Sequence, residues 1–312
     1  MTNDPPPIKT KKILVTGANG FIGSNLVRFL AKDKSLSVAS IIGPGSNGQE
    51  IKGDAVDILD FPHLREFIQK ESPEIVIHTA GYVDLRRDFG VSTLCVDANM
   101  KGTLNVLEAC RLADVKKIIF PSSYEVYGKG EIPYREESRV NPPSMYSIAK
   151  LAGELMCNLY QELYGVNYTI LRLPNVYGFG QPDARLIPNA IIKALAGDNI
   201  EISGNNKRDF LYMEDLLHAF YLAINNNLCD NRIINIGSGK GIGILEVVKV
   251  IANLLKSNIK IVVNPQVKRI GESEEMIQDI SLAKEILGWV PQYSLEQGLK
   301  KTITYYKNKV LN

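Results

Sequence analysis

A tyrosine and a lysine stand four residues apart near the middle of the chain, as Tyr146 and Lys150. On an α-helix this spacing places both side chains on one face, where a phenol and an ammonium can act on the same proton. A free tyrosine loses its proton near pH 10, so acid–base work at neutral pH requires a pKa lowered by roughly three units. Lys150 is placed to supply part of that shift. The same spacing is common on solvent-exposed helices, so the pair alone does not define a site.

A serine hydroxyl upstream makes the pattern more specific. Ser123 ends the run Phe120-Pro121-Ser122-Ser123, which we expect to close a β-strand. Side chains at the carboxyl ends of parallel strands face the ligand crevice of an open α/β sheet. Ser123 would hydrogen-bond there the substrate oxygen on which Tyr146 acts.

A glycine-rich segment near the N-terminus predicts a second kind of site. It follows the apolar run 13–15 and opens a helix-periodic segment, 22–30. In this strand–turn–helix context, glycines permit a tight turn, let the backbone approach a pyrophosphate and let the helix pack closely on the strand. The predicted dinucleotide-binding residues are Gly17, Asn19, Gly20, Phe21, Ile22 and Gly23.

The elements that must position these residues follow an alternating pattern. Apolar runs at 13–16, 37–42, 75–78, 117–121 and 167–173 are separated by helix-periodic segments. This alternation predicts an α/β fold with a Rossmann-type, doubly wound parallel sheet. After Pro174 the alternation of apolar runs and helix-periodic segments becomes less regular. We therefore expect a loose tail at 1–12, a dinucleotide-binding domain at 13–174 to which 209–236 returns, and a smaller C-terminal substrate domain. That domain comprises 175–208 and 237–312, with a helix at 244–255 and a strand at 260–263.

The sequence leaves the choice between NAD and NADP open, with NAD favoured. The acidic residue that selects NAD is missing, because the expected second strand ends Ile41-Ile42-Gly43-Pro44-Gly45. No arginine or lysine follows closely enough to bind a 2′-phosphate. Asp57, followed by Ile58, is the candidate for the adenine amino group, with Asp54 as its rival. A strand-end turn is the alternative for either aspartate.

Composition excludes several classes of partner. The chain has 312 residues, 45% of them hydrophobic and 22% charged, as expected for a globular protein of about two domains. A net charge of +2 gives no reason to expect nucleic acid or a membrane as a partner. The four cysteines are far apart and only three histidines are present, so we predict no metal site and no disulfides. A reducing cytoplasm fits this pattern, and no run suits a signal peptide or a membrane span.

Taken together, these motifs resemble the extended short-chain dehydrogenase/reductases that modify nucleotide sugars, often called NAD-dependent epimerase/dehydratases. The resemblance covers nearly the whole chain and implies a Rossmann domain with a nucleotide-sugar domain. Its motifs are Thr16 to Gly23, Ile77-His78-Thr79-Ala80-Gly81, Asn99 with Gly102-Thr103-Leu104-Asn105-Val106, Ser122 to Gly128, Tyr146 with Lys150, Leu171 to Gly178, Arg208 to Tyr212, Asn235 to Gly239, and Leu287-Gly288-Trp289.

The resemblance also implies roles for the candidate catalytic residues. It makes Tyr146 the acid/base at a sugar hydroxyl or ketone, Lys150 its electrostatic partner and nicotinamide-ribose ligand, and Ser123 a proton-sharing hydroxyl. It adds Ala80 and Asn99 to the residues that bind the cofactor.

The resemblance also implies substrate-binding roles for three residues, and two further residues are not expected to be catalytic. Asn175 would hold the sugar diphosphate, and the guanidinium groups of Arg208 and Arg269 would clamp its charge. His78 is expected to pack at a strand end, and Tyr127 to line the pocket.

Departures from the family pattern reduce the number of reactions that the resemblance allows. Dehydratases of the family place an Asp-Glu pair after the catalytic hydroxyl, whereas this chain has Tyr124-Glu125. Glu125 stays as a catalytic candidate, since some 4-keto-6-deoxy-sugar reductases and decarboxylases retain a carboxylate near the sugar. The stretch around Arg269 and Asp279 resembles the epimerase pattern instead.

We therefore predict an enzyme, an NDP-hexose epimerase acting at C4 by transient hydride transfer. The main alternative is an NAD(P)H-dependent 4-keto-6-deoxy nucleotide-sugar reductase. A dehydratase, a decarboxylase and a non-catalytic NAD(P)-binding protein are further alternatives. A homodimer through the apolar faces of the helices within 99–113 and 146–164 is expected from the family.

Overall fold

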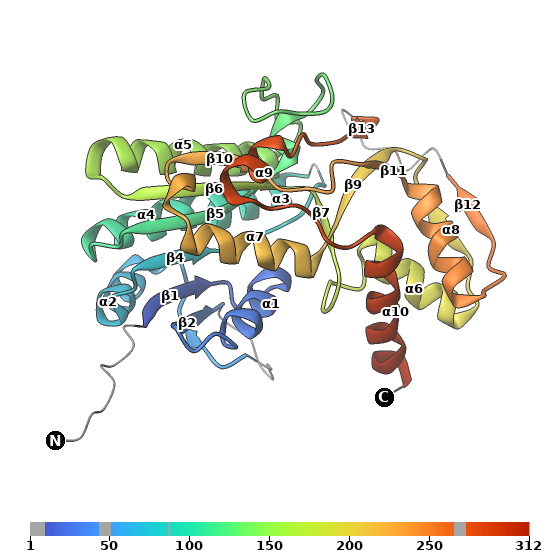
Figure 1. The fold of residues 1–312 in the computed structure, drawn as a ribbon, viewed down its shortest axis with the longest axis horizontal. Helices are drawn as coiled ribbons and strands as arrows, with labels where there is room; N and C mark the ends of the chain where they lie inside the picture. The colour runs from blue at the N-terminus through green and yellow to red at the C-terminus, as the bar shows by residue number, and fades with distance from the viewer. Residues whose placement is uncertain (1–9, 44–50, 87, 265–272, 312) are drawn as a thin grey trace.

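Two groups of secondary structure lie side by side in the protein (Figure 1). The structure, a computed structural model, describes residues 10–43, 51–86, 88–264 and 273–311. A large parallel sheet with helices on both faces forms the first group. A smaller group of short strands and three helices forms the second, and the chain first enters it after β6 (Asn167–Leu173).

Within the described residues, the large sheet has seven strands in the order β10-β6-β5-β4-β1-β2-β3, and every neighbouring pair is parallel. This order is that of a Rossmann sheet extended by β10. The predicted doubly wound parallel sheet is therefore confirmed. Chain connectivity reverses between β1 and β4, so the topological switch point lies at their carboxyl ends. Besides β6, the strands are β1 (Lys11–Thr16), β2 (Leu36–Ile42), β3 (Asp54–Ala55), β4 (Ile75–His78), β5 (Lys117–Ser123) and β10 (Arg232–Asn235).

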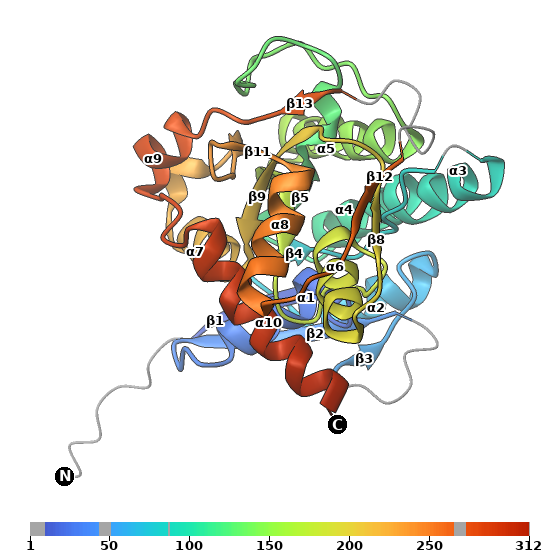
Figure 2. The ribbon, with the colours of Figure 1, turned by 90° about the vertical axis from the view of Figure 1, so that its right-hand side faces the viewer.

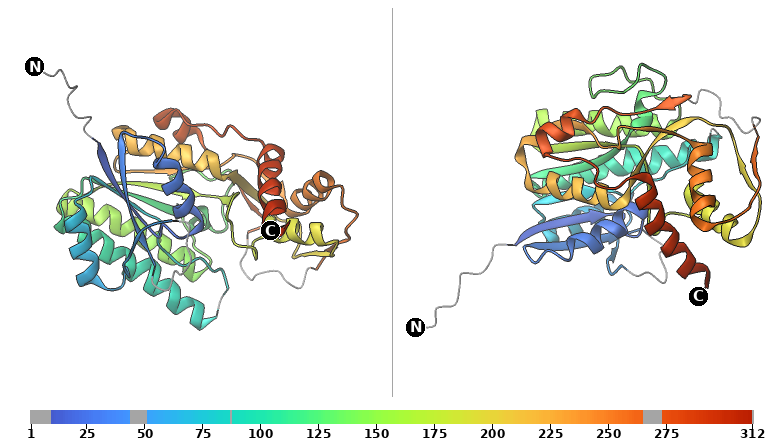
Figure 3. Two further views of the ribbon diagram at one scale, coloured as in Figure 1. Left: turned by 90° about the horizontal axis from the view of Figure 1, so that it is seen from below. Right: turned by 45° about the vertical axis from the view of Figure 1, so that its right-hand side comes forward.

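Helices cover both faces of this sheet, as Figure 3 shows from below. One face carries α2 (Phe61–Glu71), α4 (Gly102–Leu112) and α5 (Met145–Tyr164). The other carries α1 (Phe21–Leu30), α7 (Met213–Asn225) and α9 (Ser281–Leu287). All four residues of β4 are consequently buried, which explains why this strand is a continuous apolar run closed by a histidine.

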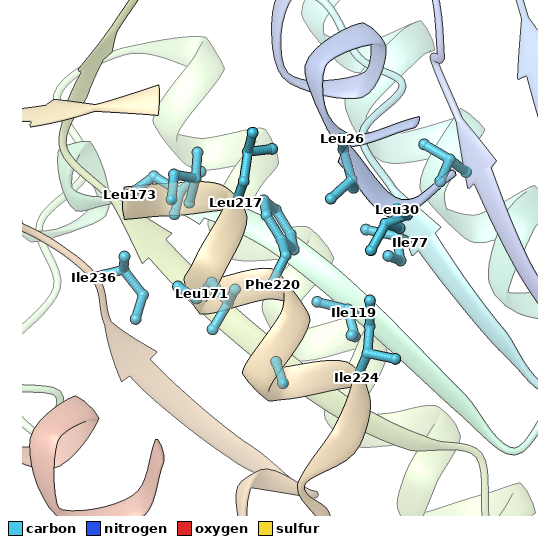
Figure 4. Close-up of a cluster of buried hydrophobic side chains, with 14 of the residues drawn as sticks. Leu26, Leu30, Ile77, Ile119, Leu171, Leu173, Leu217, Phe220, Ile224 and Ile236 are labelled. Atoms are coloured by element: carbon cyan, nitrogen blue, oxygen red, sulfur yellow. The ribbon is translucent and has the colours of Figure 1, made fainter. Parts of the chain in front are cut away.

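The larger apolar core lies between α7 and the sheet. In Figure 4, Leu217, Phe220 and Ile224 of α7 lie over Ile119 of β5 and Leu171 of β6. Burying a side chain of this size contributes roughly 1.5–3 kcal/mol to folding. This packing ties the returning segment of the chain to the cofactor-binding sheet.

Shorter helical pieces connect these elements. Between β4 and α4 the chain forms α3 (Phe89–Cys95) and a π-helical turn, η1 (Val96–Lys101), which run into α4 without an intervening loop. A single 3₁₀ turn, η2 (Tyr124–Tyr127), follows β5, and η3 (Asn227–Cys229) joins α7 to β10.

The second group, which faces the viewer in Figure 2, has an apolar core of its own. A four-stranded sheet pairs β9 with β7, β11 and β13, while β8 pairs with β12. Its apolar core includes residues from three helices and from the short strands. The strands are β7 (Asn175–Tyr177), β8 (Ile200–Ile202), β9 (Lys207–Tyr212), β11 (Gly241–Gly243), β12 (Ile261–Val263) and β13 (Glu275–Met276), and the helices are α6 (Leu186–Ala196), α8 (Ile244–Leu255) and α10 (Leu295–Leu311).

Two predicted segment boundaries need correction. The tail expected at 1–12 is too long, because Lys11 and Lys12 belong to β1 and pair with Leu36 and Ser37 of β2. The Lys11 ammonium donates to the carbonyl of Ile224 in α7 at 3.1 Å, which satisfies this polar side chain at the start of the strand. Residues 1–9 lie outside the described residues.

The predicted return of 209–236 to the large sheet holds only in part. Asp209 to Tyr212 lie in β9 of the smaller sheet, and the return begins with α7 and ends with β10. Conversely, α9 and Trp289, which we expected in the substrate domain, pack into the larger core. The indole N–H of Trp289 donates to the carbonyl of Asp215 in α7 at 3.0 Å.

Candidate active site

The glycine loop after β1 is shaped by close backbone contacts. Gly17 has φ +66°, and a Cβ added there would lie 2.5 Å from Cα of Ala80, in the loop after β4. A Cβ on Gly23 would overlap the carbonyl oxygen of Gly17. The two loops at the switch point therefore approach each other as closely as glycine permits.

The N-terminus of α1 is open to an anion. Gly20 is its N-cap and, lacking a side chain, makes no cap hydrogen bond to the first turn. The N–H groups of Phe21 and Ile22 thus point from a positive helix end toward the switch point. This arrangement fits the pyrophosphate of a dinucleotide, as the sequence predicts.

The two loops are joined by hydrogen bonds around a buried histidine. His78 lies between the hydroxyls of Thr16, at 2.8 Å, and Thr103, at 3.1 Å. Thr79 donates to the carbonyl of Thr16, and the Ala80 N–H donates to the Thr16 hydroxyl. Burial, together with the charge of Lys150, lowers the pKa of His78 to about 3. The histidine is therefore a neutral bridge, in agreement with the prediction that it packs at a strand end.

This neutral histidine predicts a pH effect on stability. Between pH 6.5 and about 3 the folded chain binds fewer protons at His78 than the unfolded chain, so the free energy of unfolding decreases as the pH falls through this range. We expect His78→Gln to show a smaller decrease than the wild type in denaturant unfolding followed from pH 7 to about pH 4. The exposed His63→Gln is the control and should follow the wild type. Equal pH slopes for wild type and His78→Gln would contradict the prediction.

The predicted catalytic hydroxyls and lysine meet between β5 and α5. Ser123 at the end of β5, and Tyr146 and Lys150 on α5, are each less than a tenth exposed. The Ser123 side chain lies close enough to Tyr146 to lower the pKa of the tyrosine. The Lys150 ammonium donates to the carbonyl of Pro121 at 2.9 Å and lies 4.7 Å from the ring centre of Phe120. The three residues singled out from the sequence are thus in one place.

The electrostatics of Tyr146 differ from expectation. Burial, and after it the charge of Glu125, raise the pKa of Tyr146, while the Ser123 hydrogen bond and the Arg185 guanidinium act in the opposite direction. The lowering expected from Lys150 is therefore not found, because burial dominates and the lysine donates to a backbone carbonyl. Burial lowers the pKa of Lys150 to about 8, and Glu154 opposes this effect.

The helix that carries Tyr146 and Lys150 begins with a capping box. The Ser144 side chain accepts from the N–H of Ser147, and the Ser147 side chain accepts from the N–H of Ser144. Tyr146 lies in the first turn, so this cap determines where its ring enters the site.

Removing the cap should affect stability and activity together. We expect Ser144→Ala to lower the free energy of unfolding by about 1 kcal/mol and to lower kcat. The matched control is Asp60→Ala, which removes the N-cap of α2. It should cost similar stability and leave kcat unchanged, as measured by chemical denaturation and by turnover of a nucleotide sugar. Equal kcat values for the two variants would contradict this role of the cap.

Some predicted cofactor residues hold loops in place. Both ends of the Asn99 amide bind the backbone of Tyr82, at 2.8 Å each. Asn19 accepts from the N–H of Gly43 at 3.2 Å, which ties the glycine loop to the end of β2. Asp57 accepts from the N–H of Leu59 at 2.9 Å in the strand-end turn that the sequence allowed as an alternative. Ile58 packs against α4, where its Cδ1 would contact a Cβ on Gly102.

The predicted substrate residues are spread over the second group. Asn175 is exposed at the start of β7, whereas Arg208 is buried and donates to the carbonyls of Lys207 and Glu274. Arg269 lies outside the described residues. Tyr127 does not line a pocket as predicted: it is fully buried, stacked on Tyr134 and bonded to Asn235.

Sequence reasoning missed two charged groups near the site. Arg185, the N-cap residue of α6, donates to the carbonyl of Val83 at 2.9 Å, and its charge reaches Tyr146. Glu154 forms a buried ion pair with Arg172. The position of Glu154 four residues after Lys150 is a signal that could have revealed it; Arg185 carried no comparable signal.

The described residues hold neither a metal-binding cluster nor a helix suited to a membrane. They contain no group of three histidine, cysteine, aspartate or glutamate side chains that could hold a metal ion. No helix among them combines the length and apolar character that crossing a membrane requires.

A Rossmann sheet with a glycine loop at the switch point, a serine at the end of β5, and a tyrosine and a lysine on the adjacent α5 defines a class of dinucleotide-dependent enzymes. The model of the NAD-dependent epimerase/dehydratase family matches residues 13–237, and the chain belongs to this family. The family predicted from the sequence motifs is thereby confirmed. Its members include enzymes of nucleotide-sugar metabolism, and this chain is an enzyme of that kind.

Similar proteins share the full length of the chain. A UDP-glucose 4-epimerase of Mycolicibacterium smegmatis is 31% identical, over 96% of this chain and 99% of that protein. The crystal structure of a UDP-glucose 4-epimerase of Thermotoga maritima with UDP-glucose has a TM-score of 0.87 and 30% identity, over 96% and 99% of the two chains. A UDP-glucuronic acid 4-epimerase of Bacillus cereus, in complex with UDP-glucuronic acid and NAD, has a TM-score of 0.86 and 28% identity, with the same coverage.

Relatives with another reaction are equally similar. A UDP-N-acetyl-α-D-glucosaminuronate decarboxylase of Bacillus cytotoxicus is 33% identical over 95% of this chain and 98% of that protein. The degree of similarity therefore shows the family but does not distinguish an epimerase from a decarboxylase. That distinction depends on the residues of the site.

Proposed function

We propose that this protein is a UDP-sugar 4-epimerase that uses NAD. The observation that carries the proposal is the meeting of Ser123, Tyr146 and Lys150 at the carboxyl edge of the sheet that carries the glycine loop. Full-length similarity to several 4-epimerases, two of them solved with UDP-sugars, supports this choice. The large sheet would bind the cofactor, and Asn175 and Arg208 in the second group, together with Arg269, would bind the UDP-sugar.

Each residue has a defined task in this proposal. The first turn of α1 and the Gly17–Gly23 loop hold a pyrophosphate, and Lys150 holds the nicotinamide ribose. With NAD bound, the positive charge of the nicotinamide would oppose the effect of burial on the pKa of Tyr146. Tyr146 would then act as a phenolate that takes the proton of the 4-hydroxyl and returns it to the same oxygen after the keto sugar has rotated, while Ser123 shares that proton. Glu125, whose charge reaches Tyr146, is the further acid–base candidate. When bound, NAD supplies a transient acceptor for the hydride at C4.

A second reaction is favoured by the position of Glu125. A carboxylate whose charge acts on Tyr146 is also suited to a keto-sugar reductase that transfers its hydride once per turnover. In that case NAD(P)H is consumed. The two reactions therefore differ in the fate of the cofactor.

The test is to incubate the purified protein with UDP-glucose, UDP-galactose, UDP-glucuronate and dTDP-, GDP- and CDP-hexoses. The sugar product is identified by NMR while nicotinamide absorbance is recorded. We expect interconversion at C4 with no net change in absorbance over many turnovers. Stoichiometric loss of NAD(P)H would show that the protein is a reductase and not an epimerase. Release of CO₂ would show that it is a decarboxylase. Turnover of none of these sugars would favour a non-catalytic NAD(P)-binding protein.

We also propose that the protein is a homodimer in the cytoplasm. Four leucine or isoleucine side chains on α5 are between two-fifths and two-thirds exposed and lie on one side of the helix: Ile148, Leu155, Leu159 and Leu163. A second copy would cover this apolar face. Leu159→Glu should convert a dimer to a monomer in analytical ultracentrifugation, and a monomeric wild type would contradict the proposal. The four free, buried cysteines support a reducing compartment.

A further inference from the structure

A buried cluster of three polar side chains lies directly behind the catalytic residues. Arg172 of β6 binds Glu154 of α5 through two contacts, Nη2 to Oε2 at 2.6 Å and Nε to Oε1 at 3.0 Å. The Ser122 hydroxyl donates to Oε1 of the same carboxylate at 2.5 Å. Glu154 and Arg172 are each 3% exposed, so the carboxylate is held in one position away from solvent.

The cluster stands on the elements that carry the proposed chemistry. Tyr146, Lys150 and Glu154 follow one another at four-residue spacing on α5, and therefore share one face of the helix. On β5, Ser122 precedes Ser123 and lies opposite Arg172 of β6. A shift of Glu154 would consequently move both the strand end and the helix face that form the site.

The helix and the strand meet closely at this point. A Cβ on Gly153 would lie 2.5 Å from the ring of Phe120, so only glycine lets α5 approach β5 here. The Lys150 ammonium lies over the same ring and donates to the carbonyl of Pro121. The lysine is thus held at the strand end next to Ser122.

The groups that face Lys150 come from three elements. Cys157 and Glu154 lie on α5, His78 on β4, and the ring of Phe120 on β5. Burial raises the pKa of Cys157 and lowers that of His78, so both are neutral near pH 7. Among these groups Glu154 is the one that carries a negative charge. Burial lowers the pKa of Lys150 to about 8, and Glu154 is the largest influence in the opposite direction.

We propose that Glu154 is a positioning residue: clamped by Arg172 and Ser122, its carboxylate fixes the strand end that carries Ser123 and the Pro121 carbonyl to which the Lys150 ammonium donates. Glu154 acts on the reaction through Lys150 and Ser123 and does not touch the sugar. The inference rests on the proposed function only for the roles of those two residues.

A single Glu154→Gln substitution leaves Arg172 buried without its ion-pair partner, which by itself can prevent folding. The decisive variant is therefore the double substitution Glu154→Met with Arg172→Met. Replacing both partners of a buried ion pair by apolar side chains of similar volume is often neutral for stability. If Glu154 served the fold alone, the double variant would regain both stability and activity.

The experiment measures the Lys150 titration directly, by NMR of protein labelled at lysine, alongside kcat, KM and the melting temperature. In the double variant we expect Lys150 to titrate at lower pH than in the wild type, and kcat to fall by about tenfold or more with a smaller change in KM. Glu296→Gln is the control, since it breaks an exposed ion pair with Lys300 on α10. It should leave all four quantities unchanged.

A folded double variant with wild-type kcat and wild-type Lys150 titration overturns the proposal. If neither Glu154 variant folds, Ser122→Ala decides, because it keeps the ion pair and removes only the hydroxyl that links the carboxylate to β5. An unchanged kcat in Ser122→Ala then overturns the proposal, and a lowered kcat at wild-type stability supports it. Failure of the proposed function is distinguishable, because the Lys150 titration can be read in a protein that turns over no nucleotide sugar.

Discussion

Tyr146→Phe should lower kcat by about a thousandfold, the largest effect expected from one side chain in this protein, since positioned acid–base groups contribute roughly 10² to 10⁴. The substitution removes one hydroxyl and leaves the ring in its apolar contacts with Val91 and Cys95. Stability should therefore change little. KM should change by less than kcat, because the hydroxyl acts on the proton that moves in the transition state.

The matched control for this prediction is Tyr160→Phe. It removes a hydroxyl from the same helix, where Tyr160 donates to Glu108 at 3.2 Å, away from the site. Rates of sugar interconversion for the two variants, measured at saturating substrate, give the comparison. A Tyr146→Phe enzyme that retains more than about a tenth of wild-type kcat would show that Tyr146 is not the acid/base.

Gly17→Ala should lower the free energy of unfolding by about 3 kcal/mol and abolish NAD binding. Two costs add at this position. A side chain at φ +66° pays a backbone strain of about 1–2 kcal/mol, and its Cβ would lie 2.5 Å from Cα of Ala80. Because Ala80 is backbone of the facing loop, relief requires the two loops at the switch point to separate. That separation also moves the N–H groups of α1 that would hold a pyrophosphate.

Gly197→Ala separates the two costs. Gly197 has φ +78°, and a Cβ there would meet nothing within 4 Å, so this variant keeps the strain and omits the contact. We expect a loss of about 1 kcal/mol and unchanged NAD binding. Chemical denaturation and titration of cofactor fluorescence measure both quantities. Equal losses of stability in the two variants would show that the contact with Ala80 is unimportant.

Local pattern was enough to predict the sheet and the position of the glycine loop. The strands at 75–78 and 167–173 and the helix at 244–255 have the bounds that were expected. Each strand is a continuous apolar run, and the helix is an amphipathic segment whose ends are marked in the sequence. In the structure, neighbouring elements cover the apolar side chains of all three, as these patterns predict. The glycine loop could be placed for the same reason, because a strand, a tight turn and a helix follow one another directly in the sequence.

The meeting of Ser123, Tyr146 and Lys150 was also predictable. Tyr146 and Lys150 share a helix face by their spacing, and the rule for parallel sheets brings a strand end to that face. What could not be predicted was their charge state. The raised pKa of Tyr146 and the lowered pKa of Lys150 follow from burial, and burial depends on every element that packs around the site.

The sequence by itself therefore determined the fold class, the family and the residues proposed for acid–base chemistry, because these depend on neighbours in the chain and on a general rule of topology. Only the tertiary structure showed that β9 belongs to the smaller sheet, that the charge of Arg185 acts on Tyr146, and that Glu154 pairs with Arg172 behind Lys150. Each of these findings depends on segments that lie in different elements. The Glu154–Arg172 pair, for example, arises from the way α5 packs on β5 and β6, which no single stretch of sequence encodes.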